Sequence, residues 1–133
     1  MPAVRCRMVR VLIVDDDETL ARTLKRALAT TGRVEAVAET SPHAAIARVI
    51  ETGRSHERFD VVLCDSRMMG ATAYDVLVAV RMYGDAAFIL MSGADEMPAA
   101  DANVLKPFSR DELMRVIDEL MARRDVAQST LSA

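Results

Sequence analysis

Cysteine is scarce in this sequence of 133 residues, which contains only Cys6 and Cys64. The two lie far apart without metal-ligand spacing, and neither His43 nor His56 is paired with them. This pattern argues against a disulfide framework and against a zinc site. A chain of this length buries a core without such crosslinks, so we expect one ordinary domain, with Cys64 as a small core residue.

Long hydrophobic runs are also missing. The longest apolar stretches, such as 11–14 and 86–91, are far shorter than the roughly 20 residues of a membrane-spanning helix. Several arginines stand near the N-terminus, but no apolar signal-peptide core of sufficient length follows them. We therefore expect a cytoplasmic protein without a membrane partner.

An excess of positive charge is absent too. The formal net charge is −3 at pH 7, which gives no electrostatic footprint for DNA or RNA. Hydrophobic residues make up 51% of the chain and charged residues 28%, close to the average of soluble globular proteins. The composition therefore indicates a soluble domain that does not bind nucleic acid directly.

Lysine is rare, because only Lys25 and Lys106 are lysine among the seventeen basic residues. Arginine thus supplies nearly all of the solvated positive charge, and the two residue types are not interchangeable. A lysine directly before Pro107 therefore indicates a specific role for Lys106.

Short apolar runs alternate with amphipathic segments along the chain. Runs that end at acidic or polar residues are typical of strands buried on both faces of a parallel sheet. Five strands are predicted, at 10–14, 34–38, 59–64, 86–91 and 103–105. Alternating strands and helices predict an α/β fold, a single doubly wound domain with helices on both faces of the sheet.

Helical spacing and capping residues place helices between these strands. The first helix has an apolar stripe of Leu20, Leu24, Ala27 and Leu28 and stops near Gly32. The other expected caps are Ser41 before Pro42, the Thr72 and Asp75 capping box, and Ser109 with Glu112. We divide the chain into an N-terminal extension (1–9), the domain (10–124) and a tail (125–133) that is a frayed end or the start of a linker.

Polar side chains follow the predicted strands at the point where each one ends. Three aspartates, 15–17, follow the first strand, Asp65 follows the third, Ser92 the fourth and Lys106 the fifth. Chemistry in open α/β sheets gathers at this edge. Clustered carboxylates repel one another unless a cation compensates them, and all-oxygen ligation suits Mg²⁺. The sequence therefore predicts a magnesium site at this edge.

An aspartate beside such a metal is a candidate nucleophile for phosphorus, because carboxylates form aspartyl-phosphate intermediates. The metal, a lysine and a hydroxyl would share the charge of the phosphoryl oxygens. Asp17 also has a simpler role, since an acid in this position stabilises the start of the first helix.

Three segments resemble the response-regulator receiver domains of two-component signalling. Residues 11–17 resemble that family's acidic strand end, 61–68 its phosphorylation strand, and 106–108 its lysine-proline signature, often with a cis peptide between the two. The likeness runs from about Arg10 to Arg124. It implies a five-stranded parallel sheet in the flavodoxin-like order 2-1-3-4-5.

The resemblance also implies a role for each residue at the strand ends. The roles are Mg²⁺ ligation by Asp15 and Asp16, phosphoryl acceptance and Mg²⁺ ligation by Asp65, Mg²⁺ ligation by the backbone carbonyl of Arg67, and contact with the phosphoryl group by Ser92 and Lys106. The implied donor is a phosphohistidine on a histidine kinase or a histidine phosphotransfer protein. Such a domain modifies itself and is not a dedicated enzyme, and its output domain or partner stays open, as does whether it stands alone or belongs to a longer regulator.

The sequence departs from that family at several positions. Met69 stands where proline is usual, Ala73 where glycine is usual, and Asn103 where the family has its aromatic switch residue. Thirteen residues between Ser92 and Lys106 leave no room for both an average helix and a strand. We therefore expect the fourth helix of the family to be a single turn or absent.

Two other functions stay open. Departures such as Asn103 fit a pseudo-receiver that docks a partner without being phosphorylated. Residues 15–19 also resemble the nucleophile loop of haloacid-dehalogenase-type phosphohydrolases. That family needs a further acidic pair at a strand end after its lysine, whereas Asp111 and Glu112 lie in the first turn of a predicted helix, and Asp65 would have no task.

Overall fold

The computed structural model describes residues 7–132, apart from residues 69, 71 and 95. Cys6, Met69 and most of the N-terminal extension therefore lie outside the described residues. Within the described part of the chain, no helix has both the length and the apolar character of a membrane span.

Five parallel strands form one sheet at the centre of the molecule. They are β1 (Val9–Val14), β2 (Val34–Glu39), β3 (Val61–Asp65), β4 (Ala87–Ser92) and β5 (Ala102–Leu105). Their order across the sheet is β2-β1-β3-β4-β5, which confirms the predicted fold class and topology. The strands lie within one or two residues of their predicted bounds.

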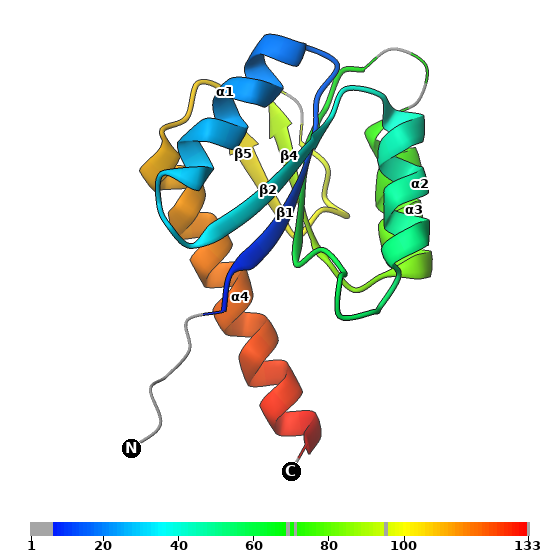
Figure 1. Cartoon of the computed structure of the whole chain (residues 1–133), viewed down its shortest axis with the longest axis vertical. Helices are drawn as coiled ribbons and strands as arrows, with labels where there is room; N and C mark the ends of the chain where they lie inside the picture. Colours follow the sequence, from blue (N-terminus) through cyan, green and yellow to red (C-terminus); the bar gives the residue numbers. More distant parts are fainter. Residues whose placement is uncertain (1–6, 69, 71, 95, 133) are drawn as a thin grey trace.

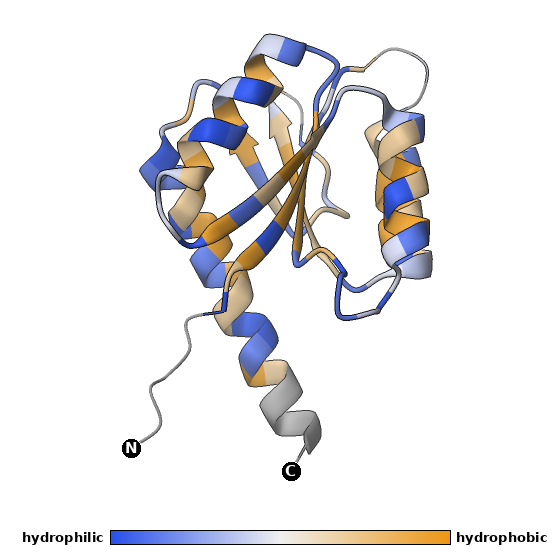
Figure 2. Cartoon of the chain, in the orientation of Figure 1, coloured by the Kyte–Doolittle hydropathy of each residue, from blue (hydrophilic) through white to orange (hydrophobic). Residues whose placement is uncertain are grey.

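Four helices cover the two faces of this sheet. They are α1 (Glu18–Ala29), α2 (Pro42–Thr52), α3 (Ala73–Tyr83) and α4 (Arg110–Ser132). Helices α1 and α4 lie on one face, and α2 and α3 on the other (Figure 1). Apolar side chains fill both interfaces, and the strands form the most apolar layer of the molecule (Figure 2).

The helices begin at the predicted caps. The Asp17 carboxylate accepts the Leu20 backbone N–H, and Ser41 accepts that of Ala44. At α3, Thr72 and Asp75 form the complete capping box. The hydroxyl of Ser109 likewise accepts the Glu112 N–H at 3.0 Å. These caps satisfy backbone donors that have no partner within the helix.

The connection from β4 to β5 contains no helix among its described residues, as the spacing from Ser92 to Lys106 predicts. Met97, from the middle of this connection, supplies a buried side chain to the cluster between the sheet and helices α2 and α3. A loop residue thus covers part of the surface where a helix would otherwise pack.

Helix α4 differs from the expected division of the chain. The segment 125–132, expected as a frayed end or linker start, continues the helix to Ser132. The helix has 23 residues and is about 34 Å long, and its last part extends past the sheet (Figure 1). Arg124 ties the helix to the start of β3 through Asp60, whose Oδ1 lies 3.1 Å from the guanidinium.

Candidate functional site

The ends of β1 and β3 bring three carboxylates together. One oxygen from each of Asp15, Asp16 and Asp65 lies within 4.8 Å of the others. The pairing of β1 with β3 produces this arrangement, because Val14 lies opposite Cys64 and both strands end in aspartate at the next residue. The predicted acidic cluster therefore exists in the fold.

Lys106 joins this cluster from the end of β5. Its Nζ donates a hydrogen bond to Asp65 Oδ1 at 2.7 Å and lies 3.6 Å from Asp15 Oδ2. Strand β4 lies between β3 and β5, so the lysine side chain reaches across the end of β4 to meet the two acids. The Lys106–Pro107 peptide bond is cis.

Asp15 is buried and sits in a constrained position. Its Oδ1 accepts the backbone N–H of Asp17 at 3.0 Å. Burial raises the pKa of the Asp15 carboxyl, and the charge of Asp65 adds to this, while the Asp17 hydrogen bond and Lys106 oppose it. The raised pKa of Asp15 therefore reflects its burial first and the neighbouring carboxylate second.

The pKa of Lys106 is set by opposing effects. Burial acts to lower it, but the hydrogen bond and charge of Asp65, together with Asp15, outweigh burial, so the pKa of Lys106 is raised. Lys106 is thus an ammonium ion at neutral pH. This ammonium contacts two buried carboxylates, those of Asp65 and Asp15, while Asp16, the third member of the cluster, is exposed toward solvent.

This donor set fits Mg²⁺. The ion accepts one or two carboxylates and keeps several waters, so a half-open cluster suits it better than a closed cage. A divalent cation would also reduce the repulsion among the clustered carboxylates. The Arg67 backbone carbonyl, the further ligand implied by the resemblance, stays a prediction.

Ser92 ends β4 beside the acidic cluster and is 1% exposed. Its Oγ accepts the backbone N–H of Ala94 at 3.1 Å. A cavity of about 330 Å³ opens here, and the residues that line it are Asp65, Ser66, Arg67, Gly93, Ala94 and Lys106. The predicted site residues Asp65, Arg67 and Lys106 therefore share one opening.

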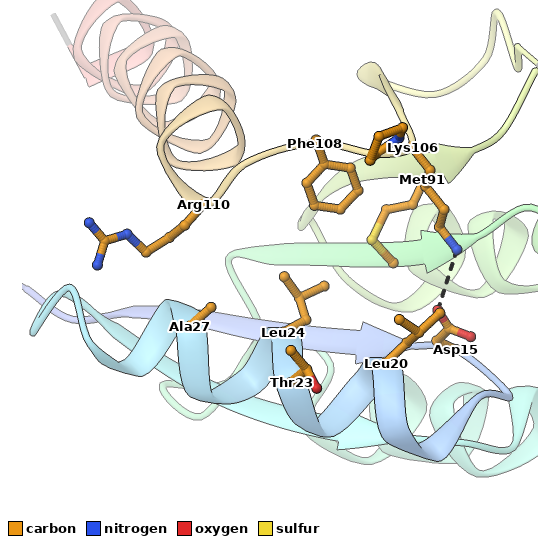
Figure 3. Close-up of a pocket in the computed structure, with 10 residues that line it drawn as sticks. Asp15, Leu20, Thr23, Leu24, Ala27, Met91, Lys106, Phe108 and Arg110 are labelled. Atoms are coloured by element: carbon orange, nitrogen blue, oxygen red, sulfur yellow. Dashed lines mark ion pairs between the residues drawn. The ribbon is translucent and has the colours of Figure 1, made fainter.

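A second, mostly apolar groove of about 480 Å³ starts at the same site and runs along α1. Leu20 and Leu24 line it on one side and Phe108 on the other, with Asp15 and Lys106 at its end (Figure 3). Leu20 is 49% exposed, although helical spacing assigns it to the buried stripe. The stripe divides because Ala21 and Leu28 face the sheet while Leu20 faces the groove.

Cys64, next to the acceptor candidate, is fully buried. Burial raises the pKa of its thiol, and the charges of Asp65 and Asp15 add to this effect. It is therefore a neutral core side chain, because reactive cysteines have lowered pKa values. The sequence did not predict two features near the site: the hydrogen bond from the Ala94 N–H to Ser92, and the groove beside Leu20. The spacing of α1 alone does not indicate which stripe residues the sheet covers.

Comparison with known proteins identifies the family. The family model of the response regulator receiver domain matches residues 11–118. The chain belongs to this family. Receiver domains of this family act in two-component signalling. The acidic pair that a haloacid dehalogenase needs after its lysine is not found at a strand end here, since Asp111 and Glu112 lie in the first turn of α4.

Sequence relatives of this receiver domain are longer than the chain itself. The transcriptional regulatory protein NarL of Mycobacterium tuberculosis is 30% identical over 132 residues, which cover 92% of this chain and 59% of NarL. A protein of Haloferax volcanii is 37% identical over 131 residues, covering 92% of this chain and 21% of that protein. The chain thus spans about three fifths and about one fifth of these relatives.

Solved structures agree with the fold. A receiver domain protein from Clostridium thermocellum superposes with a TM-score of 0.79 at 20% identity, over 90% of this chain and 99% of that one. The response regulator TrrA of Thermotoga maritima, crystallised in complex with Mg²⁺-BeF, has a TM-score of 0.73 at 28% identity, over 85% of this chain and 99% of TrrA.

Proposed function

We propose that this receiver domain accepts a phosphoryl group on Asp65 from a phosphohistidine of a histidine kinase or histidine phosphotransfer protein. The observation that carries the proposal is the contact of Asp65 with Lys106 inside a cluster of three carboxylates. A lone buried aspartate would be a structural residue, whereas this one lies in an open cavity beside a cation.

The proposed step is an in-line displacement at phosphorus. One Asp65 carboxylate oxygen forms a bond to phosphorus while the bond from phosphorus to the donor imidazole nitrogen breaks. The electron pair of that bond stays on the nitrogen, which takes a proton from solvent. The products are an aspartyl phosphate and a neutral histidine.

Mg²⁺ is the proposed cofactor, with Asp15, Asp16, Asp65 and the Arg67 carbonyl as its ligands. When bound, it would neutralise charge on the phosphoryl oxygens. TrrA, 28% identical, was crystallised with Mg²⁺-BeF, which supports this proposal by similarity.

Lys106 and Ser92 have separate proposed tasks. The Lys106 ammonium, which now donates to Asp65 Oδ1, is placed to bind a phosphoryl oxygen once that carboxylate is phosphorylated. The Ser92 hydroxyl, now an acceptor for Ala94, would donate to another phosphoryl oxygen after rotation. Asp65 is the acceptor and is regenerated by hydrolysis, so the domain is a self-modifying switch and not a dedicated enzyme.

The donor protein is proposed to dock along the groove beside α1. Leu20 and Leu24 expose apolar surface there, and the groove leads to Asp15 and Lys106. An apolar helix face on the donor would fit this surface and bring a histidine to the acidic edge. The output stays a separate question, because the chain matches only part of each longer relative.

Asn103 favours a second candidate, the pseudo-receiver. The family's aromatic residue is replaced here by a side chain that binds loop backbone, so coupling by ring rotation is not available. A protein of this kind would keep its acidic cluster but dock a partner without phosphorylation.

One experiment separates these functions. The protein is incubated with Mg²⁺ and acetyl phosphate, and intact mass spectrometry measures the gain of one phosphoryl group. We expect the gain in the natural protein and its loss in Asp65→Asn, while Asp60→Asn, the same change at another buried aspartate, retains it. A natural protein that gains no phosphoryl group and whose spectrum does not change with beryllofluoride would support the pseudo-receiver.

Two further variants test the phosphohydrolase alternative. Turnover of a phosphomonoester is measured for Asp65→Ala and Asp15→Ala. We expect neither the natural protein nor the variants to show sustained turnover. Hydrolysis that persists in Asp65→Ala and disappears in Asp15→Ala would reverse the assignment, because Asp15 would then be the nucleophile.

A further inference from the structure

Side-chain hydrogen bonds hold the described part of the connection between β4 and β5 in place. Near its start, Ser92 binds the Ala94 N–H. Farther on, Asn103 binds both backbone groups of Met97: its Oδ1 accepts the Met97 N–H at 2.8 Å, and its Nδ2 donates to the Met97 carbonyl at 3.2 Å. The asparagine amide thus pairs with Met97 in the way that a neighbouring strand would.

The later part of this connection, Met97–Asp101, is fixed from several sides. The Met97 side chain is 6% exposed and belongs to the apolar cluster under α2 and α3. Arg81 of α3 donates to the Ala99 carbonyl at 3.2 Å and pairs with Asp101 at 3.1 Å. Asp101 also accepts the Phe88 N–H at 2.7 Å. We call Met97–Asp101 the clamped half.

The earlier part of the connection faces the acceptor site. Gly93 and Ala94 line the same cavity as Asp65 and Lys106. We call these two residues the acceptor half. A phosphoryl group on Asp65 would occupy this cavity and draw the Ser92 hydroxyl away from Ala94, so it acts first on the acceptor half.

We propose that Asn103 is a positioning residue whose clamp on Met97 stops the structural response to phosphorylation at the boundary between these two halves. The proposal rests on the phosphoacceptor function proposed above. An aromatic ring at this position would connect the strand to the site by rotating. The side-chain amide of Asn103 instead binds one loop residue, Met97, through both its oxygen and an N–H. The structural response to phosphorylation therefore stays in the acceptor half and does not reach the clamped half, which contacts α3 through Arg81.

The clamp itself is tested first, without any phosphoryl group. Amide hydrogen exchange is measured by NMR on the full chain. In Asn103→Ala the Met97 amide should exchange about tenfold faster or more, because a directed hydrogen bond is lost, while the Phe88 amide is unchanged. Asn103→Asp keeps an acceptor for the Met97 N–H but loses the donor, so it should restore part of the protection.

Arg81→Ala is the matched control. It removes the contacts to Ala99 and Asp101 and leaves the Asn103 amide in place. Its Met97 amide should exchange at the natural rate. Equal Met97 exchange in Asn103→Ala and in the natural protein would overturn the clamp, as would an Arg81→Ala effect on Met97 equal to that of Asn103→Ala.

The boundary is tested next by adding Mg²⁺ and beryllofluoride and following amide chemical shifts. In the natural protein, Gly93 and Ala94 should shift while Met97–Asp101 stay in place; in Asn103→Ala the shifts should extend to Asp101. Shifts that already cross Met97 in the natural protein would overturn the proposal. If not even the Ala94 amide shifts in the natural protein, both the phosphoacceptor function and the boundary are contradicted. The hydrogen-exchange result is independent of phosphorylation, so it still shows whether Asn103 clamps Met97.

Discussion

Two buried aspartates, Asp65 and Asp60, stand at opposite ends of β3 and differ in how their charge is balanced. Asp60 precedes the strand, and both of its oxygens are occupied: Oδ2 accepts the Arg10 N–H at 2.9 Å, and Oδ1 accepts from Arg124 at 3.1 Å. Asp65 instead shares the Lys106 ammonium with Asp15, and an Asp16 oxygen lies in the same cluster. The Asp60 end of β3 is thus saturated with hydrogen-bond partners, whereas the Asp65 end lies in a cluster of carboxylates that could hold a metal ion.

The largest expected effect is the loss of phosphorylation when Asp65 is changed. Asp65→Asn should accept no phosphoryl group, because the amide is not a nucleophile, whereas Asp60→Asn should be phosphorylated like the natural protein. Intact mass after acetyl phosphate treatment measures both. Phosphorylation of Asp65→Asn at the natural level would end the distinction between the two aspartates.

The next effect concerns stability at the saturated end. Arg124→Ala leaves Asp60 buried with one hydrogen bond fewer, and the free energy of unfolding should fall by about 2 kcal/mol. Arg123→Ala, next to it on α4, removes an exposed pair with Glu119 and should cost at most about 0.5 kcal/mol. Urea unfolding compares the two, and equal losses would show that Arg124 has no special structural role.

Near Asp65, removing the Asp15 carboxylate should raise stability in EDTA and lower it, relative to the natural protein, in Mg²⁺. With EDTA, Asp15→Asn relieves like-charge repulsion of roughly 1 kcal/mol and should raise the unfolding temperature. With Mg²⁺, the natural protein should gain stability that the variant does not, since ligand binding stabilises only the folded state. Thermal unfolding in both buffers measures this, and a variant destabilised in EDTA would contradict the repulsion between Asp15 and its neighbouring carboxylates.

The raised pKa of the Asp15 carboxyl predicts how the free energy of unfolding changes with pH. The pKa of Asp15 is raised above its ordinary value of 3.8, so the folded state holds this proton more tightly than the unfolded chain does. In metal-free buffer its contribution to stability is fully present below pH 3.8 and is lost as the pH rises through the folded-state pKa. The difference in unfolding free energy between natural protein and Asp15→Asn, followed across this range, should show that loss.

The smallest effect belongs to Asp85, which also pairs with Arg124 but at the surface. Asp85→Asn should lower the free energy of unfolding by less than about 0.5 kcal/mol, because exposed ion pairs contribute little. Asp85 also lies 3.5 Å from Arg58, so a loss as large as that of Arg124→Ala would show that the surface pairs of Asp85 with its two arginines contribute as much as the buried pair with Asp60.

Much of this site follows from local sequence patterns. Apolar runs that end in Asp15, Asp65 and Ser92 predict where each side chain leaves the sheet, and the strand order then brings them together. The caps at Asp17 and Thr72 are equally local, since each binds an amide three residues away. The helix-free connection after Ser92 follows from its length alone.

Other contacts could not be predicted in this way. The sequence pattern places Asp60 in a strand, but its partner Arg124 lies 64 residues away. The chain has many arginines, and the pattern does not indicate which of them contacts Asp60. The exposure of Leu20 depends on the position of Phe108 across the groove, which helical spacing does not encode. Asn103 signals a departure from the family, yet its pairing with Met97 depends on the path of the loop.

The sequence by itself determined the strands, the caps and the polar residues at the strand ends, because hydrophobic runs and their polar ends are local properties of the chain, and its motifs indicated the family and, through it, the strand order. Only the tertiary structure decided which aspartate is saturated, where the groove opens and how Asn103 holds the loop. These depend on distances between segments far apart in sequence, and packing sets those distances.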